Sequence, residues 1–199
     1  TIAACHFIKE ERKDLTNCKR SKKSEKAEED EQMIINNLKK GDVVFVAYRH
    51  IINSDLMHNY PSEAWFQNEL TTRTLNTFNQ KISSKGGKLV LINPLPEFEL
   101  SIEQCIPQWY RPLKIKACGK SIRQIILERE KVYSLIENFL DKDILVWDPI
   151  KSLCKNDFCF MTDENLKPLY VDTNHLTEYA NIKYIYPNLR DFLLRKKLL

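Results

Sequence analysis

Three short apolar runs constrain the fold of this chain more than any other feature of its sequence. They are DVVFVAY at 42–48, KLVLINPLP at 88–96 and DILVWDP at 143–149, and each is rich in β-branched residues. Nearly continuous apolar runs of this length are typical of parallel strands that are covered on both faces. The sequence therefore predicts a buried sheet.

Helical patterns flank and separate these three runs. Apolar residues recur at three- and four-residue spacing over about 24–40, 62–84, 120–140 and 177–196. Gly41 should end the first pattern, and the KGG at 85–87 the second. Pro187 should bend the last pattern or divide it in two. The alternation of helix and strand predicts an α/β fold with a parallel sheet flanked by helices, in one domain over residues 1–199.

The charge pattern argues against several classes of ligand. The chain has 31 Lys and Arg against 27 Asp and Glu, and much of its positive charge lies at 9–26 and 190–197. Neither stretch interleaves aromatic with basic residues, so we expect solvated faces and no nucleic-acid partner. No Gly-rich phosphate loop is present, which disfavours a flavodoxin-like nucleotide binder, and we expect no cofactor. The sequence contains no run of eighteen apolar residues, which is the length expected of a membrane span.

Six cysteines fall into three local couples, Cys5 with Cys18, Cys105 with Cys118, and Cys154 with Cys159. Six thiols allow 15 pairings, and locality favours these three. The spacings do not match the paired Cys-x-x-Cys pattern of zinc sites, so we expect disulfides and no metal, with free core thiols as the alternative. Disulfides would place the chain in an oxidising compartment.

In α/β sheets, ligands bind outside the carboxyl ends of the strands. This rule directs attention to 47–53, to 93–99, to the residues after WDP, and to YVDTNHL at 170–176. In the last segment, Asp172 could accept the Nδ1 proton of His175 and leave Nε2 free to take a proton from a hydroxyl. The alternative is helix capping, with Asp172 or Thr173 bound to backbone N–H groups and His175 in the first helical turn.

The segment YVDTNHLTEYA resembles the last sequence block of the SGNH hydrolase superfamily, in which Asp-x-x-His-Leu opens the final helix. More closely, the chain is similar to the extracytoplasmic SGNH domain fused to bacterial membrane acyltransferases of the acyltransferase-3 type. The similarity rests on ACHF…NCKR, DVVFVAYRH, INPLPEFELSIEQC and DPIKSLCKNDFCF…LYVDTNHLTEYA. It implies a three-layer, flavodoxin-like sheet, and a Ser-His-Asp triad to which Asp172 and His175 contribute.

The resemblance also implies parts that the sequence does not show. Family members carry a Gly-Asp-Ser block after a first strand, ahead of the first cysteine couple, and its serine is the nucleophile. This block and its strand are expected upstream of Thr1, since Gly41 to Val43 precedes a strand instead of following one. The 199-residue chain alone should then lack serine-dependent esterase activity.

The oxyanion hole is a second departure from the superfamily pattern. The position after the first apolar run reads Tyr48-Arg49-His50, without the Gly-x-Asn of the superfamily. Arg49 is a candidate oxyanion donor or substrate ligand, with a plain surface charge as the alternative. His50 and His58 are expected to be polar loop residues.

The resemblance implies acyl transfer, of acetyl by analogy, to a cell-surface polysaccharide or lipopolysaccharide, or hydrolysis of such an ester. The alternative is a catalytically inactive SGNH-like domain that binds or positions glycan. The partners would be an acyl donor, a glycan acceptor, and a fused or associated membrane acyltransferase domain. The location would be periplasmic or otherwise extracytoplasmic, tethered to the inner membrane.

Overall fold

The computed structural model describes residues 22–47, 69–107, 109–110 and 118–199. These residues belong to two compact units. The first unit comprises Thr1–Ile92 and Lys131–Val146, and the second comprises Asn93–Glu130 and Trp147–Leu199. The assignment of residues 1–199 to one domain stays a prediction.

The predicted parallel strands are present in a three-stranded sheet of order β1-β2-β4. Strands β1 (Val43–Ala47) and β2 (Lys88–Ile92) pair in parallel, with Val43 opposite Lys88 and Ala47 opposite Ile92. Strand β4 (Leu145–Trp147) lies on the other side of β2. Each strand is shorter than its apolar run; β2 ends before Pro94 and Pro96, which have no N–H group to donate to a neighbouring strand. The α/β class is confirmed.

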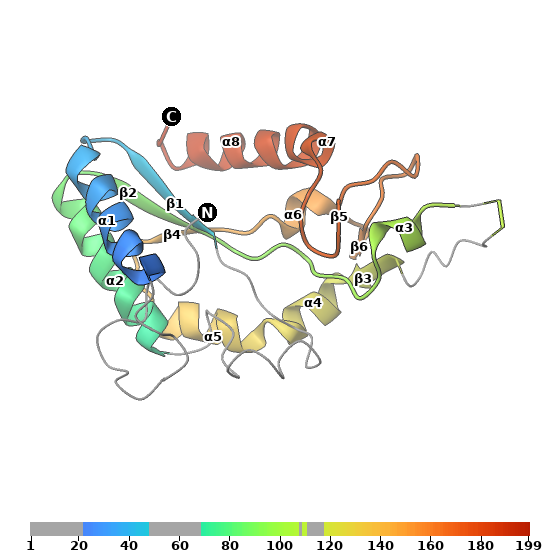
Figure 1. The fold of residues 1–199 in the computed structure, drawn as a ribbon, viewed down its shortest axis with the longest axis horizontal. Helices are drawn as coiled ribbons and strands as arrows, with labels where there is room; N and C mark the ends of the chain where they lie inside the picture. The colour runs from blue at the N-terminus through green and yellow to red at the C-terminus, as the bar shows by residue number, and fades with distance from the viewer. Residues whose placement is uncertain (1–21, 48–68, 108, 111–117) are drawn as a thin grey trace. The chain divides into compact units, whose positions relative to one another are not determined.

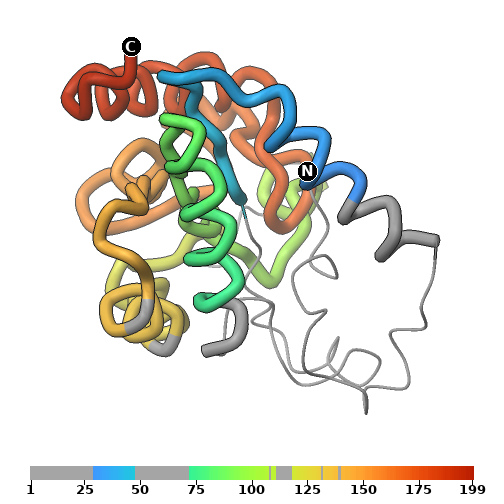
Figure 2. The backbone as a smooth tube through the Cα atoms, turned by 90° about the vertical axis from the view of Figure 1, so that its left-hand side faces the viewer, coloured from blue at the N-terminus to red at the C-terminus, as the bar shows by residue number. Residues whose placement is uncertain are grey.

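Helices of the first unit cover this sheet with aliphatic side chains. They are α1 (Lys22–Asn37), α2 (Glu69–Ser84) and most of α5 (Glu130–Phe139). Figures 1 and 2 show α2 running alongside the strands β1 and β2. α1 ends at Asn37, so Gly41 does not end it as expected; Gly41 takes a positive φ of 94° in the following turn, where the N–H of Asp42 donates to the carbonyl of Lys39 at 3.1 Å. The buried core of this unit consists of Ile35, Val46, Leu75, Phe78, Ile82, Leu89, Leu91, Val132 and Ile144.

The second unit contains a small antiparallel sheet that the sequence did not predict. Its order is β3-β6-β5, with β3 (Gly119–Ser121), β5 (Cys154–Lys155) and β6 (Phe158–Phe160). Asn156 and Asp157 join β5 to β6 with φ values of 50° and 60°, which are the positive values that a tight type I′ hairpin requires. Short helices α3 (Ile102–Cys105) and α6 (Ile150–Leu153) lie in the same unit.

The prediction of a single helix over 120–140 is wrong. Lys120 lies in β3, and Ser121 caps α4 (Ile122–Glu128) by accepting the N–H of Gln124 at 3.1 Å. A capping residue is extended and precedes the helix, so the helix begins two residues later than its polar start indicated. Arg129 (φ −109°, ψ 3°) then separates α4 from α5.

The last helix continues through Pro187 without a break, contrary to the expected bend or division. It begins as α7 (Glu178–Ala180), passes through a π-helical turn at Asn181–Ile185, and continues as α8 (Tyr186–Arg195). Pro187 lies in the first turn of α8, and Figure 1 shows the segments in line. A π turn widens the backbone before the proline. The wider turn leaves room for the proline ring, and it accommodates the hydrogen bond that proline cannot donate.

Two of the three expected cysteine couples are bonded in the second unit. Cys105 is joined to Cys118, and Cys154 to Cys159 across the β5–β6 hairpin. Cys5 and Cys18 lie outside the described residues. The buried core around the two disulfides consists of Phe98, Ile102, Ile125, Ile150, Met161, Leu169, Tyr170 and Ala180, together with three of the cysteines.

Candidate active site

The side chains of Asp172 and His175 meet in a loop of the second unit. His175 Nδ1 lies 2.6 Å from Asp172 Oδ2. The other carboxylate oxygen, Oδ1, accepts the backbone N–H groups of Asn174 at 2.8 Å and of His175 at 2.7 Å. A single carboxylate therefore fixes both the turn of the backbone and the direction of the imidazole.

The protonation of Asp172 decides which tautomer His175 adopts. Partial burial acts to raise the pKa of the Asp172 carboxyl, but the N–H groups of Asn174 and His175 and the imidazole outweigh it, and the pKa lies below its ordinary value. An ionised carboxylate only accepts hydrogen bonds, so Nδ1 of His175 carries the proton. In the neutral imidazole the lone pair then lies on Nε2, which is the arrangement of a general base.

The imidazole is accessible from solvent. The side chain of His175 is 72% exposed and that of Asp172 is 49% exposed. Within the described part of the chain, Nε2 of His175 makes no hydrogen bond. A reacting hydroxyl could therefore approach Nε2 without displacing a described partner.

The loop that carries this pair is closed at its base. Tyr170 and Leu176 form an antiparallel bridge, and the N–H of Val171 donates to the carbonyl of His175 at 2.9 Å. The Tyr170 side chain is 1% exposed, and its ring packs edge-on against Phe98 with centroids 5.0 Å apart. Burial raises the pKa of the Tyr170 hydroxyl, so this side chain stays neutral inside the core.

The loop is also tied to the residues that follow β2. The N–H of Phe98 donates to the carbonyl of Thr173 at 3.0 Å. Upstream, Asn93 is 5% exposed and donates from Nδ2 to Asp148 Oδ2 at 2.9 Å. Asn93 directly follows β2 and Asp148 directly follows β4, where ligands are expected in such sheets. Both segments were expected to lie near a ligand, but the pair itself was not predicted, although a polar residue placed directly after a buried strand was the available signal.

The helix-capping alternative is correct that Asp172 binds backbone N–H groups, and it is wrong about which residue caps the helix. The final helix is capped by Thr177, whose Oγ1 accepts the N–H of Ala180 at 3.1 Å. His175 therefore precedes the helix instead of lying in its first turn. Asp172 does bind backbone N–H groups, but they belong to its own turn, and its second oxygen still holds the imidazole.

The remaining predicted site residues are not brought to this pair. Arg49, His50 and His58 lie outside the described residues. Among the serines that the structure describes, none has its hydroxyl bonded to His175. Ser121 Oγ caps α4, and Ser152 Oγ is buried without a hydrogen-bond partner in the described residues.

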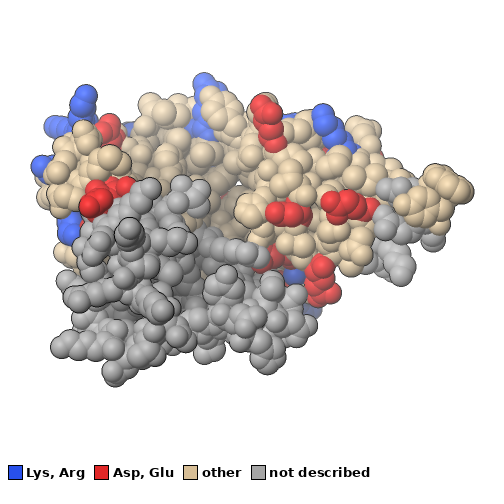
Figure 3. Space-filling view, viewed as in Figure 1, with Lys and Arg blue, Asp and Glu red and all other residues tan. Residues whose placement is uncertain are grey.

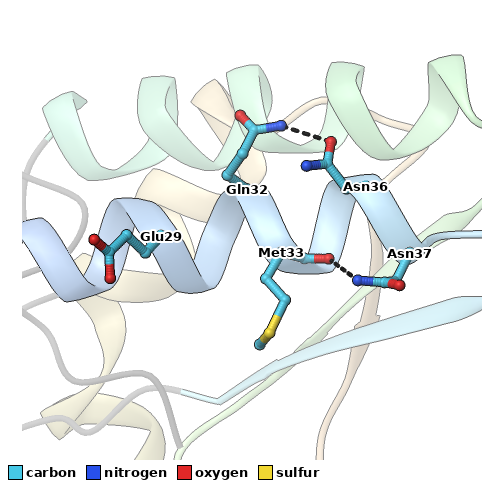
Figure 4. Close-up of a pocket in the computed structure, with 5 residues that line it drawn as sticks. All are labelled: Glu29, Gln32, Met33, Asn36 and Asn37. Atoms are coloured by element: carbon cyan, nitrogen blue, oxygen red, sulfur yellow. Dashed lines mark hydrogen bonds between the residues drawn. The ribbon is translucent and has the colours of Figure 1, made fainter.

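A second hollow in the described residues, on α1, brings no histidine and carboxylate together. Figure 4 shows a hollow lined by one face of α1, where Gln32 donates to Asn36 and Asn37 donates to the carbonyl of Met33, both at 2.8 Å. On the face drawn in Figure 3, charged side chains of both signs are scattered over the described surface.

The described ranges contain neither a metal site nor a helix that could span a membrane. Residues 22–47, 69–107, 109–110 and 118–199 contain no cluster of three or more His, Cys, Asp or Glu side chains suited to a metal ion. In the same ranges every helix is too short or too polar to cross a membrane.

Comparison with known proteins gives one match. The model of a protein family described as "SGNH domain (fused to AT3 domains)" matches residues 1–184. The matched range includes β1, β2 and β4, both described disulfides, and the Asp172–His175 pair. No curated protein and no solved structure matches the chain.

Proposed function

Because the chain belongs to the family of SGNH domains fused to AT3 domains, we propose that it transfers an O-acyl group to a cell-surface polysaccharide or hydrolyses one from it. The acyl group is acetyl, and the protein's own AT3 domain, in the membrane, supplies the activated donor. The family supports an acyl-transfer or hydrolase type of chemistry in general. The observation that supports the residue roles is the 2.6 Å contact between His175 Nδ1 and Asp172 Oδ2.

In the proposed first step, a serine hydroxyl attacks the acyl carbonyl carbon of the donor ester. His175 Nε2 takes the serine proton as the Oγ–C bond forms, and the carbonyl electrons move onto oxygen. The oxyanion collapses, the donor C–O bond breaks, and the imidazolium returns the proton to the leaving oxygen. The product is an acyl-serine, and we propose that the serine comes from a segment N-terminal to Thr1.

In the second step, an acceptor hydroxyl takes the place of the serine hydroxyl. His175 Nε2 removes the proton of a sugar hydroxyl or of water, the acceptor oxygen attacks the acyl-serine, and the proton passes to serine Oγ as the ester breaks. A sugar acceptor gives transfer and water gives hydrolysis. Asp172 stays ionised throughout and stabilises the imidazolium, in keeping with its lowered pKa.

The two described disulfides support an extracytoplasmic location. Such bonds persist in oxidising compartments such as the periplasm, and an acceptor on the cell surface would be reached from there. We also propose that Arg49 donates a hydrogen bond to the oxyanion or binds the substrate.

The test uses protein that includes the sequence preceding Thr1, with p-nitrophenyl acetate as donor. We expect turnover in the parent protein, labelling of one serine by a fluorophosphonate, and loss of at least about 10³-fold in kcat for His175→Ala. Purified surface polysaccharide, added as acceptor, should become acetylated by mass measurement. Turnover in the parent protein no faster than in His175→Ala or in buffer alone would contradict the proposal and favour a glycan-binding role without catalysis.

A further inference from the structure

A second site of a different kind lies in the second unit. It is a cavity of about 800 Å³, which is within the range of small-molecule sites, and neither Asp172 nor His175 lines it. Its walls come from the β5–β6 hairpin, from the loop at 162–166, and from the π-helical turn that carries Lys183 and Tyr184. The catalytic proposal uses none of these residues.

One wall of the cavity is aromatic. The rings of Phe158 and Phe160 lie on β6 with centroids 4.7 Å apart and planes inclined by 40°. They lie close over Gly119 of β3, where an added Cβ would come within 2.3 Å of Phe158 and 2.8 Å of Phe160. The glycine therefore leaves the room that both rings occupy. Partly buried rings held in this way offer flat apolar faces to a ligand.

The charged groups of the cavity cancel one another. Lys155 is paired with Glu164. Asp163 accepts the hydroxyl of Tyr179 at 2.6 Å, and Lys183 Nζ lies 3.6 Å from the same carboxylate. Two cations and two anions line the cavity, and each has a partner of opposite charge. A cavity of this kind has little preference for an ionic ligand and presents hydrogen-bonding groups to a neutral one.

The loop at 162–166 is held in a fixed and unusual shape. Asp163 Oδ1 accepts the N–H groups of Asn165 and Lys167, both at 2.9 Å. Between them, Leu166 adopts a left-handed φ of 61°, which a leucine rarely takes, and its side chain is part of the cavity wall. Strain of this kind persists where the surrounding structure holds it, and it clusters at ligand sites.

From these features we propose that the cavity binds a neutral pyranose unit of a glycan. The C–H face of the sugar ring packs against Phe158 and Phe160, while its hydroxyl groups bond the polar rim that includes Asn165 and Thr162. The glycan as ligand rests on the proposed function, because a chain that acylates a polysaccharide has to hold it. The cavity would hold a sugar unit other than the one that reacts.

Nuclear magnetic resonance titration of the chain with methyl glycosides of glucose, galactose, mannose and rhamnose tests this proposal. We expect saturable binding of at least one of the four. Phe158→Leu keeps apolar volume but removes the aromatic face, and Asn165→Ala removes a rim amide while leaving the turn; each should weaken binding about 2- to 10-fold. Asn37→Ala, an exposed Asn on α1, is the matched control and should leave the affinity unchanged.

The His175→Ala variant separates this proposal from the catalytic one. In protein that includes the proposed serine it should lose turnover, and it should keep the parent affinity for the glycoside. The proposal is overturned if no glycoside binds, if Phe158→Leu and Asn165→Ala bind as the parent does, or if octanoate displaces the sugar and binds more tightly. It is also overturned, with the catalytic role supported, if His175→Ala alone abolishes sugar binding. Full turnover in His175→Ala refutes the catalytic role, whereas Phe158→Leu still decides whether the cavity binds sugar.

Discussion

The two units of this chain are stabilised by different means. The first unit buries a continuous cluster of aliphatic and aromatic side chains between helices and a parallel sheet. The second unit contains both described disulfides, a sheet of very short strands, and four buried polar residues: Asn93, Lys120, Arg129 and Asn174. It also contains the Asp172–His175 loop and the aromatic cavity.

This difference shows where a chain of this kind can place irregular backbone. A loop that must hold an imidazole within hydrogen-bonding distance of a carboxylate cannot rely on regular helix or strand bonds. In the second unit, cross-links and hydrogen bonds from side chains to backbone take that role. The first unit obtains its order from apolar burial, which is non-directional.

The largest expected effect separates function from stability in the second unit. Asp172→Asn keeps an oxygen that can accept the turn N–H groups but removes the charge that stabilises imidazolium. In protein that includes the proposed serine, kcat for p-nitrophenyl acetate should fall on the order of 10⁴-fold. Thermal unfolding should show only a small loss of stability. A variant that unfolds while the residual folded fraction stays active would mean that Asp172 serves the turn alone.

The next largest effect should appear in the first unit. Leu89→Ala in β2 removes a fully buried side chain and should cost about 2 to 5 kcal/mol of unfolding free energy, measured by urea denaturation. The control of the same residue type is Leu127→Ala in α4 of the second unit, because Leu127 is 62% exposed, and it should change stability by less than about 0.5 kcal/mol. Similar losses for both leucines would contradict the view that apolar burial dominates the first unit.

The disulfide that closes the longer loop should contribute more to the unfolding free energy. The Cys105–Cys118 bond spans 13 residues and the Cys154–Cys159 bond spans 5. The double Cys→Ala variants should lose about 3 and about 2 kcal/mol respectively, because a longer loop has more entropy to lose in the unfolded chain. Hydrogen exchange should show the loss mainly in amides of the second unit. Equal loss of protection in both units would show that they unfold together and contradict the view that they are stabilised by different means.

Acid should weaken the second unit through Asp163. The hydroxyl of Tyr179 is the main cause that lowers the pKa of the Asp163 carboxyl; burial opposes it, and the N–H groups of Lys167 and Asn165 add to the lowering. A lowered folded pKa stabilises the fold above the unfolded value near 4, and this stabilisation disappears as the pH falls through the folded value. If the thermal midpoint is measured from pH 7 downwards, it should begin to decrease once the pH is below about 4. Asp163→Asn should start lower at pH 7 and fall less steeply.

The smallest effect should be a gain. Asp157 lies at φ 60° in the hairpin turn, where glycine has no steric cost, and its backbone carbonyl accepts the N–H of Ile122 at 2.9 Å. Asp157→Gly keeps that carbonyl and gives the Asn-Gly pair that type I′ turns favour. We expect a gain of about 0.5 to 1 kcal/mol in the unfolding free energy. A loss would indicate that the Asp157 side chain has a role of its own.

The same contrast explains how much could be predicted from sequence. The strands β1, β2 and β4 and the helices beside them were readable because continuous apolar runs and helical spacing directly reflect burial. The antiparallel sheet was missed because its strands have two or three residues, which is too short for any periodicity to register. The start of α4 was misplaced because Lys120 suits a helix, and only tertiary pairing with Cys159 draws it into β3.

The candidate site divides along similar lines. The pairing of Asp172 with His175 was predicted from their spacing and from the resemblance, and the structure brings the two groups together. The bond between Asn93 and Asp148 and the cavity depend on contacts between distant segments, whereas Thr177 caps the helix through Ala180, only three residues away. One sequence read by itself marks polar residues after buried strands but carries no direct signal that two of them meet.

The two oxygens of Asp172 have separate duties, one toward the peptide backbone and the other toward the ring of His175. As a result, the shape of the turn and the choice of tautomer are not independent variables. Glutamate would place its two oxygens on a longer side chain, so that it could bind the backbone N–H groups or the imidazole but not both. Selection that preserves the fold of this hairpin-like loop would therefore preserve the basicity of the imidazole as well, whether or not the domain still performs chemistry.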